Sequence, residues 1–450
     1  MKKLRICSVL LIGLMFLGGT AFAFSPADHV KVAPNGKGDL IFFPWYYTDT
    51  DGWQTKLTII NTSDTYNTVA KVVVRSYNWS EELVDFLIYL SPNDVWTGVL
   101  ISKRDGTYIE STDDSCLYKY PANNTAVAAD FASTTDPARK FSSILFDTSC
   151  AGDATNLGYV EVIEAATTTS SLGDLKKVSG KVAKENIYNW YKSFSDKGGI
   201  TSDCLPQNIL TGYYEWSNSM GSGYAATSRG EIFADWGNYT YLDLTGNTGI
   251  NSNSNNTIGE LEAAMAKRDV SLPYANKTNG DVAVHVFNFP TKLSTLNRTE
   301  DEKLGCVYKG YVNSPYFALN AKCETYTNSI YDLLENTPAT SGSIVSGGTT
   351  DSPEMCNEVE MLVTNYTSTV FSEGWVRYNW NRTPTDKDFR TVSVVNSGLY
   401  SGTPVLPVTV LFNSSSVTIA ADAHTDGDVY EGTELLIPWL PYYQYTNIYR

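Results

Sequence analysis

Few residues in this chain are suited to acid–base or nucleophilic catalysis. The 450 residues include three histidines, His29, His285 and His424. A Ser–His–Asp hydrolase would have to use one of them. His29 stands near the predicted mature N-terminus, His285 alternates within a predicted strand, and His424 falls in a polar loop. No Gly-x-Ser-x-Gly sequence supports a hydrolase nucleophile. The sequence therefore favours a protein that is not an enzyme.

Paired carboxylates are the second arrangement that could do chemistry. Glu161, Glu164 and Glu215 occur in strand-like segments, and two carboxylates across an aromatic cleft could cleave a glycosidic bond. Glu161 and Glu164 are three residues apart, which in a strand places them on opposite faces of the sheet. Solvated sheet residues are the simpler interpretation. A secreted glycan-binding or glycan-cleaving protein is the alternative that we carry forward.

Clustered aspartates make calcium the candidate inorganic ligand, and no organic cofactor is expected. Asp426 and Asp428 lie in the segment DAHTDGD, and a second acidic turn covers Asp49–Gly52. Oxygen ligands in turns suit Ca²⁺, but neither segment has the spacing of an EF-hand loop. Asp-Gly is also a strong hairpin signal. Asp426 and Asp428 are the predicted ligands if calcium binds.

The cysteine pattern predicts disulfides. Apart from Cys7 in the leader, the chain has six cysteines: Cys116, Cys150, Cys204, Cys306, Cys323 and Cys356. An even number in an exported chain indicates three bridges and no free thiol. No CxxC pair or zinc-type cluster occurs. Six cysteines allow 15 connectivities, of which spacing favours Cys306–Cys323 with Cys116–Cys150, leaving Cys204–Cys356.

The first 23 residues have the features of a cleavable signal peptide. A basic start (Lys2, Lys3, Arg5) precedes a short apolar run, and Ala21-Phe22-Ala23 supplies small residues before the cut. The run is too short to span a bilayer comfortably, and no transmembrane segment follows it. The mature chain carries 30 basic and 49 acidic residues, a net charge of −19. That balance argues against nucleic acid or an anionic membrane as the main partner.

Short alternating segments dominate the rest of the chain. Turn signals separate them about every ten residues, which is typical of an antiparallel β-sandwich. The predicted strands are Asp39–Tyr47, Trp53–Asn61, Val69–Tyr77, Leu83–Leu90, Asp94–Ser102, Gly158–Ala165, Val282–Phe289, Glu358–Asn365, Gly374–Trp380, Val405–Phe412 and Glu434–Tyr445. We therefore predict a mostly β fold in which strand exceeds helix at least about twofold, against the usual excess of helix.

Loops and helices complete the predicted organisation. Ser111–Thr155 is expected to be a long loop pinned by a disulfide, and Thr167–Asp196 and Ile258–Asp269 are the helix candidates. The predicted units are the signal peptide (1–23), an N-terminal β-sandwich (24–165), and a second β-rich domain with helical insertions and a C-terminal strand (166–450).

One block of sequence resembles a known family. Within Leu40–Val99, a Pro-Trp-Tyr strand, Gly-Trp-x-Thr and the run Asp85 to Gly98, which contains LSPNDVWTG, resemble a family of exported, largely uncharacterised surface proteins of Gram-negative bacteria. Weaker matches include Gly158–Glu164 and Val286–Lys292. The resemblance implies export and a β-rich envelope protein, and it implies no catalytic residues.

Together these features predict a non-enzymatic structural protein, secreted or at the cell surface, that self-associates into a filament, sheath or surface layer. Asp39–Tyr47 and Glu434–Tyr445 are both apolar, aromatic and Pro-containing, as strands at sheet edges can be. Such edges can pair with a second copy of the chain. We expect terminal strands to connect the copies, with glycans as the alternative partner.

Overall fold

The structure is a computed structural model of the whole chain. The described residues are 30–113, 117–119, 143–147, 155–169, 177–178, 181–182, 184–194, 199–220, 225–237, 242, 250, 258–267, 269–275, 282–292, 297–298, 308–309, 323–332, 354–364, 373–380, 400–401, 403–412, 417–421 and 428–429. The predicted signal peptide lies outside these ranges. Within them, neither helix has the length and apolar character needed to cross a bilayer.

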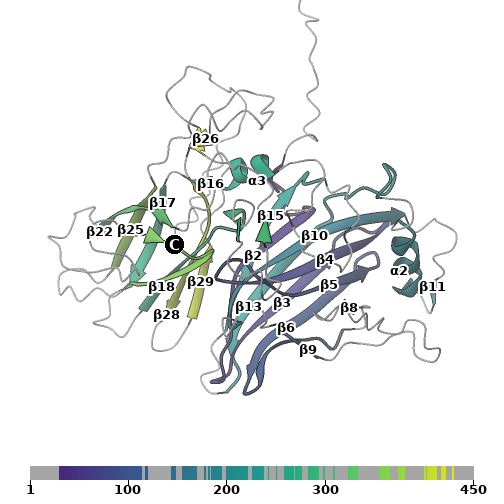
Figure 1. Ribbon diagram of the computed structural model, residues 1–450, viewed down its shortest axis with the longest axis horizontal. Coiled ribbons are helices and arrows are strands. Elements are labelled where there is room, and N and C mark those ends of the chain that lie inside the picture. Colours follow the sequence, from purple (N-terminus) through teal and green to yellow (C-terminus); the bar gives the residue numbers. More distant parts are fainter. Residues whose placement is uncertain are drawn as a thin grey trace, which may run out of the picture.

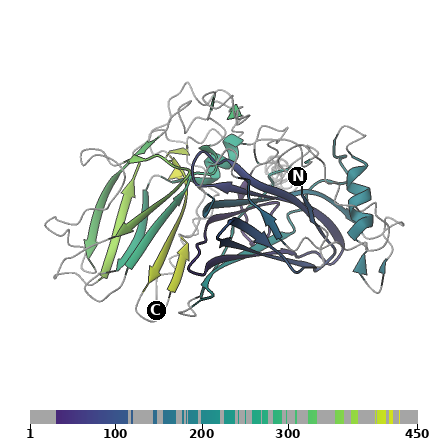
Figure 2. The same cartoon turned by 60° about the horizontal axis from the view of Figure 1, so that its bottom comes forward.

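A β-sandwich of two antiparallel sheets forms the larger unit, on the right of Figure 1. The seven-stranded sheet runs β1 (Lys31–Val32), β15 (Glu231–Ala234), β2 (Leu40–Tyr47), β10 (Leu157–Thr169), β4 (Tyr66–Ser76), β5 (Glu82–Leu90) and β8 (Leu117–Lys119). The six-stranded sheet runs β14 (Ala225–Arg229), β13 (Leu210–Asn218), β3 (Trp53–Asn61), β6 (Val95–Lys103), β7 (Gly106–Glu110) and β9 (Ser143–Leu145). Figure 2 shows the two sheets from a second direction.

The core between these sheets follows from the alternation of the strands. In β3, Thr55, Leu57 and Ile59 are buried, while the residues between them are partly exposed. Aromatic contacts cross from one sheet to the other. The ring centres of Phe86 and Trp96 are 5.5 Å apart, and those of Phe43 in β2 and Tyr214 in β13 are 6.0 Å apart. By contrast, β4, β5 and β10 are buried on both faces. A second layer must therefore cover the outer face of the large sheet.

The predicted edge strand near the N-terminus is an internal strand. β2 pairs with β10 on one side and with β15 on the other. Its Pro44 is tolerated because the register between β2 and β10 shifts here, with Phe43 opposite Val160 and Tyr46 opposite Gly158. A bulge leaves residues outside the ladder, so the missing N–H of proline removes no bond.

The division of the chain also differs from the predicted boundary after residue 165. β13, β14 and β15, which come after that boundary, complete the two sheets of the N-terminal sandwich. None of these three strands was among those predicted from the sequence, so the boundary was drawn before the segments that complete the two sheets.

The second unit, on the left of Figure 1, packs a four-stranded sheet against a three-stranded sheet. The first runs β24 (Val359–Thr364), β18 (Val282–Asn288), β28 (Leu406–Phe412) and β29 (Val417–Ala421); the second runs β17 (Asp269–Ala275), β25 (Glu373–Asn379) and β22 (Thr327–Asp332). Two-residue ladders are β11 (Lys177–Val178) with β12 (Lys181–Val182), β16 (Ala266–Lys267) with β27 (Thr403–Pro404), β19 (Asn297–Arg298) with β20 (Tyr308–Lys309), β21 (Glu324–Thr325) with β23 (Glu354–Met355), and β26 (Tyr400–Ser401) with β30 (Asp428–Val429).

The four-stranded sheet belongs to two hydrophobic cores. Val284 and Val286 join the core of the first unit, whereas Phe287 and Leu362 join the core of the second. At the contact between the units, Phe412 lies 5.4 Å from Trp216 and 6.4 Å from Trp53. The two tryptophans stack with their ring centres 3.8 Å apart. The units therefore share apolar surface and are not joined by a linker alone.

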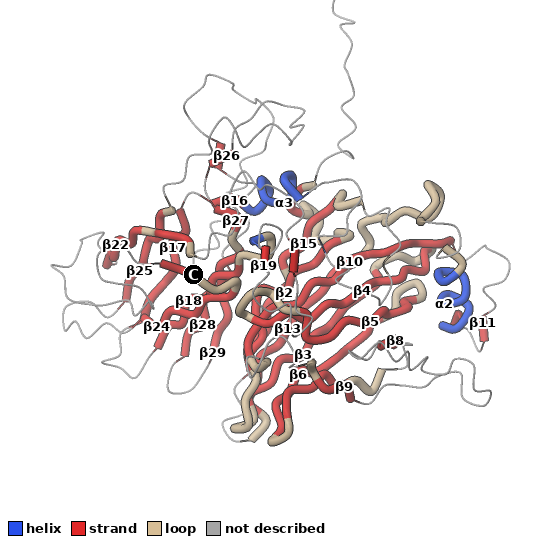
Figure 3. The backbone as a smooth tube through the Cα atoms, in the orientation of Figure 1, coloured by secondary structure: helices blue, strands red, loops and turns tan. Residues whose placement is uncertain are grey.

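Helix is minor in the described residues, which confirms the predicted β fold (Figure 3). Helix α2 covers Lys184–Lys192, a short part of the predicted Thr167–Asp196, because β10 continues to Thr169. Helix α3 covers Ile258–Met265, so the predicted end at Asp269 was wrong: Asp269 begins β17. Ser111–Thr155 was predicted as loop and contains two three-residue strands, β8 and β9.

Candidate functional site

The one histidine in the described residues is part of the second core. His285 is buried, and its Nε2 lies 2.7 Å from the carbonyl oxygen of Pro273, to which it donates. Its Nδ1 then accepts from the Tyr378 hydroxyl, 2.6 Å away. Burial lowers the pKa of His285 to about 4. The ring is a neutral cross-link between sheets. His29 and His424 lie outside the described residues.

The three candidate glutamates do not converge on one site. Glu161 and Glu164 lie on opposite faces of β10, as predicted from their spacing. Glu161 accepts a hydrogen bond from Arg75, whereas Glu164 accepts one from Thr68. Glu215 stands on β13 in the other sheet, opposite Lys56 of β3. These positions give no pair of carboxylates across a common substrate.

Buried charged side chains gather on the outer face of the large sheet, an arrangement that sequence reasoning missed. Arg75 Nε lies 2.6 Å from Glu161 Oε1, and both side chains are fully buried. Lys71 Nζ lies 2.7 Å from Asp85 Oδ2. Glu82 stands opposite Arg75, and burial, followed by the charge of Asp85, raises its pKa to about 7. The available signal was the even spacing of Lys71 and Arg75 within an otherwise apolar strand.

A second group of buried carboxyls holds loops against the same sheet. Asp39 accepts the backbone N–H groups of Trp236 and Gly237 at 2.9 and 2.8 Å. Glu164 accepts the N–H of Gln207 at 3.1 Å. Burial raises the pKa of Asp39 to about 7 and that of Glu164 to about 8, and the charge of Asp39 adds to the rise at Glu164. Both carboxyls therefore bind backbone N–H groups of loop residues and hold those loops against the sheet.

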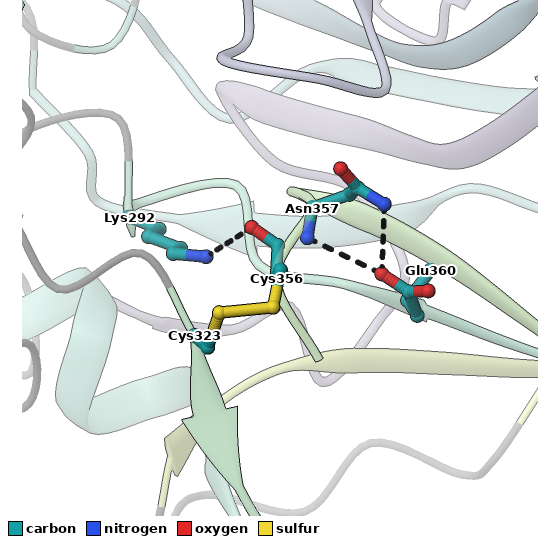
Figure 4. Close-up of a disulfide and its surroundings, with 5 residues drawn as sticks. All are labelled: Lys292, Cys323, Cys356, Asn357 and Glu360. Atoms are coloured by element: carbon teal, nitrogen blue, oxygen red, sulfur yellow. Dashed lines mark hydrogen bonds between the residues drawn. A yellow bond between two sulfur atoms is a disulfide. The ribbon is translucent and has the colours of Figure 1, made fainter. Parts of the chain in front are cut away.

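The disulfide seen in the described residues joins Cys323 to Cys356, which corrects the pairing that spacing favoured (Figure 4). Cys306 cannot then pair with Cys323, nor Cys204 with Cys356. The bridge adjoins the β21–β23 ladder, and strand pairing can bring together cysteines that are distant in sequence. Cys204 is buried in the first core. Cys116, Cys150 and Cys306 lie outside the described residues.

Glu354 brings a carboxylate close to this disulfide. One ligand atom from each of Cys323, Glu354 and Cys356 lies within 4.8 Å of the others. Metals bind the thiolate form of cysteine, and here the two sulfurs are bonded to each other. Lys292 Nζ instead donates to the carbonyl oxygen of Cys356 at 2.9 Å, and Glu360 accepts from Asn357 (Figure 4). The surroundings are those of a structural bridge.

The predicted calcium ligands are not brought together by any described contact. Asp426 lies outside the described residues, and Asp428 opens β30, opposite Ser401. In the other acidic turn, Asp49 Oδ1 accepts the backbone N–H groups of Asp51 and Trp53. Gly52 has φ +95°, which suits glycine. This turn connects β2 of one sheet to β3 of the other, and calcium at Asp426 and Asp428 stays a prediction.

The sheet edges of the second unit offer main-chain groups for binding. β17, β22, β24 and β29 each pair with a neighbouring strand on one side only, within the part of the chain that is described. In β24, the Val359 N–H points away from β18 and donates to the Tyr77 oxygen. Because N–H groups alternate along a strand, those of Met361 and Val363 point the same way. The side chain of Val363 is 43% exposed.

A partly exposed aromatic pair lies on the outer face of the three-stranded sheet. Tyr331 of β22 stands opposite Trp375 of β25, and their rings stack 4.1 Å apart at 18°. Arg377, two residues along, forms an ion pair with Asp269. The outer face of this sheet therefore carries an aromatic pair bordered by a charged side chain.

Comparisons with known proteins find no match, whether the sequence is compared with family models and curated proteins or the fold with solved structures.

Proposed function

We propose that this protein is a non-enzymatic structural component, secreted to the surface of a Gram-negative bacterium, that self-associates into a filament, sheath or surface layer. The observation that carries the proposal is the edge of β24. Its outward N–H and C=O groups at Met361 and Val363 could accept a strand from another copy. The buried charged side chains of the large sheet also support it. They bond strand to strand, as Arg75 does to Glu161, or loop to strand, as Asp39 does, and so serve to hold the fold together.

The candidate donor is the C-terminal segment Glu434–Tyr445, which lies outside the described residues. Pro438 and Pro441 are three residues apart, so in one continuous strand they would interrupt both rows of N–H groups. We therefore expect pairing through a shorter part, with Leu435, Leu436 and Ile437 as the apolar anchor. The N-terminal strand Asp39–Tyr47, predicted as the other connecting strand, pairs with β10 and, over Leu40–Phe42, with β15, so it is not an edge strand.

Removal of residues 434–450 tests the donor. We expect the full-length mature protein to form polymers visible by electron microscopy and the truncated protein to remain monomeric by light scattering. A truncated protein that still forms the same polymers would contradict the role of the tail. A full-length protein that stays monomeric at high concentration would contradict self-association itself.

Val363→Pro tests the acceptor edge. The outward N–H is removed while the bonds of β24 to β18 remain, so we expect loss of polymers with an unchanged far-ultraviolet circular dichroism spectrum. Val363→Lys, which places a charge at the edge, should act in the same way if proline distorts the strand. Met220→Lys is the matched control, because Met220 is 74% exposed at a hairpin away from this edge. Polymers that survive both Val363 variants would rule out β24.

The stacked pair Tyr331 and Trp375 favours one alternative, a glycan-binding surface protein. A glycan array with the wild type and Trp375→Ala would distinguish the two functions. Binding that is lost in the variant, together with a monomeric wild type, would replace the structural proposal with the glycan one.

A further inference from the structure

We propose that Lys71 and Asp85 become joined by an amide bond between their side chains, a covalent cross-link between β4 and β5. Lys71 Nζ lies 2.7 Å from Asp85 Oδ2, and the two side chains are 0% and 5% exposed. A nitrogen in direct contact with a carboxyl oxygen also lies close to the carboxyl carbon. Well-oriented groups at that separation can react as if present at very high concentration.

The surroundings favour the neutral product. Lys71 lies opposite Leu87 on β5 and opposite Ile163 on β10, and both are buried. Two charges in such surroundings lose much of their hydration, a loss that their mutual attraction offsets only in part. The amide removes both charges, keeps one N–H and one C=O for hydrogen bonding, and forms where bulk water is excluded.

The step is a condensation that balances without an oxidant or a co-reactant. A proton passes from the Lys71 ammonium to the Asp85 carboxylate, which leaves a neutral amine and a neutral acid. The nitrogen lone pair attacks Asp85 Cγ, so a C–N bond forms and one C–O bond breaks. The departing oxygen leaves as water with the acid proton and one proton from the amine.

Glu82 is the carboxyl placed to assist. It interacts electrostatically with both Lys71 and Asp85, and burial raises its pKa to about 7, so its neutral form can donate a proton and recover one. Arg75 and Glu161 on the same face pair with each other. When Glu82 is neutral, the amide removes the positive charge of Lys71 and the negative charge of Asp85, and the remaining charges of Arg75 and Glu161 cancel. We assign Glu82 the role of proton transfer in this step.

Lys292 provides an internal comparison. It is as buried as Lys71, at 1% exposed, but its Nζ donates to the Cys356 carbonyl oxygen. The charge of Lys292 also interacts with Glu358 and Glu360. The proposal concerns Lys71, and a cross-link at Lys292 in its place would count against it.

The test is the mass of the full-length chain, unfolded and with its disulfides reduced. We expect a mass lower than the sequence mass by one water, and a digest in which a single branched peptide joins Lys71 to Asp85. Lys71→Arg keeps the charge but lacks the amine, so its mass should equal its sequence mass. No loss of water in the wild type, or a loss mapped to another site such as a succinimide at Asp105, would overturn the proposal.

The role of Glu82 is tested by following the loss of water while the reduced chain refolds. In the wild type the rate should fall as the pH rises above about 7, because the neutral carboxyl disappears. Glu82→Gln should slow the loss at least about tenfold and flatten this pH profile, and Glu82→Asp should restore part of the rate. Glu164→Gln on the opposite face is the matched control. A profile unchanged in Glu82→Gln would exclude the assigned role.

Discussion

Asp39 and Glu164 show how buried carboxyls can tie the stability of this protein to pH. Burial raises the pKa of each above its ordinary value, 3.8 for Asp39 and 4.5 for Glu164, to about 7 and about 8. The folded state then binds these protons more tightly than the unfolded state does. Their contribution to stability is complete below the ordinary values and is lost as the pH rises through about 7 to 8.

We therefore expect the melting temperature to fall between pH 6 and pH 9, and to fall less in Glu164→Gln. The amide cannot ionise and can still accept the Gln207 N–H. The difference between the two slopes should amount to several degrees, measured by differential scanning calorimetry. Parallel slopes in the two proteins would mean that Glu164 does not titrate in this range.

At the same scale, the Arg75–Glu161 pair should behave as a buried pair. Arg75→Met leaves the Glu161 carboxylate without its main partner, and we expect a loss of about 3–5 kcal/mol in the free energy of unfolding. The double variant Arg75→Met/Glu161→Leu should recover most of this loss. Lys103→Met, in the exposed pair with Glu110, is the control and should change little. Denaturant titration gives all three values, and equal losses in the single and double variants would contradict this account.

At the scale of the element, Gly158 is required by the close packing of β10 against β4. A Cβ at this position would lie 1.9 Å from the backbone oxygen of Arg75, and backbone on a central strand has little freedom to move. We expect Gly158→Ala to destabilise the protein by roughly 3 kcal/mol or more, measured by denaturant unfolding. Ala225→Ser, on an exposed position of β14, is the control. A cost below about 1 kcal/mol would show that β10 shifts easily.

For the whole molecule, the four-stranded sheet shared by the two cores predicts a single unfolding transition. If one unit unfolded alone, the apolar side chains through which the four-stranded sheet contacts that unit would become exposed to water. We expect Val408→Ala, in the first core, and Phe287→Ala, in the second, to lower the temperature of the same calorimetric transition. Phe287→Ala should reduce the free energy of unfolding by about 3–5 kcal/mol. Two transitions that respond separately to the two variants would show that the units are independent.

Local pattern identified many strands of this fold but not their partners, and it missed β13, β14, β15, β17 and β22. Trp53–Asn61 was predicted as a strand with the bounds of β3, because alternation is a property of neighbouring residues. The helix predicted over Thr167–Asp196 was too long, because pairing with β4 extends β10 to Thr169 and helix covers only Lys184–Lys192 within that range. A segment with some helix propensity forms a strand when pairing in a long ladder gives it more hydrogen bonds and more burial than an isolated helical turn would.

The candidate sites divide in the same way. The shortage of histidine, the opposite faces of Glu161 and Glu164 and the even number of cysteines can be read directly from residue types and spacing. The pairing of Cys323 with Cys356, the internal position of Asp39–Tyr47 and the approach of Lys71 to Asp85 depend on which strands lie side by side. Strand pairing is a long-range choice set by the burial of whole faces, so only the tertiary structure decides it.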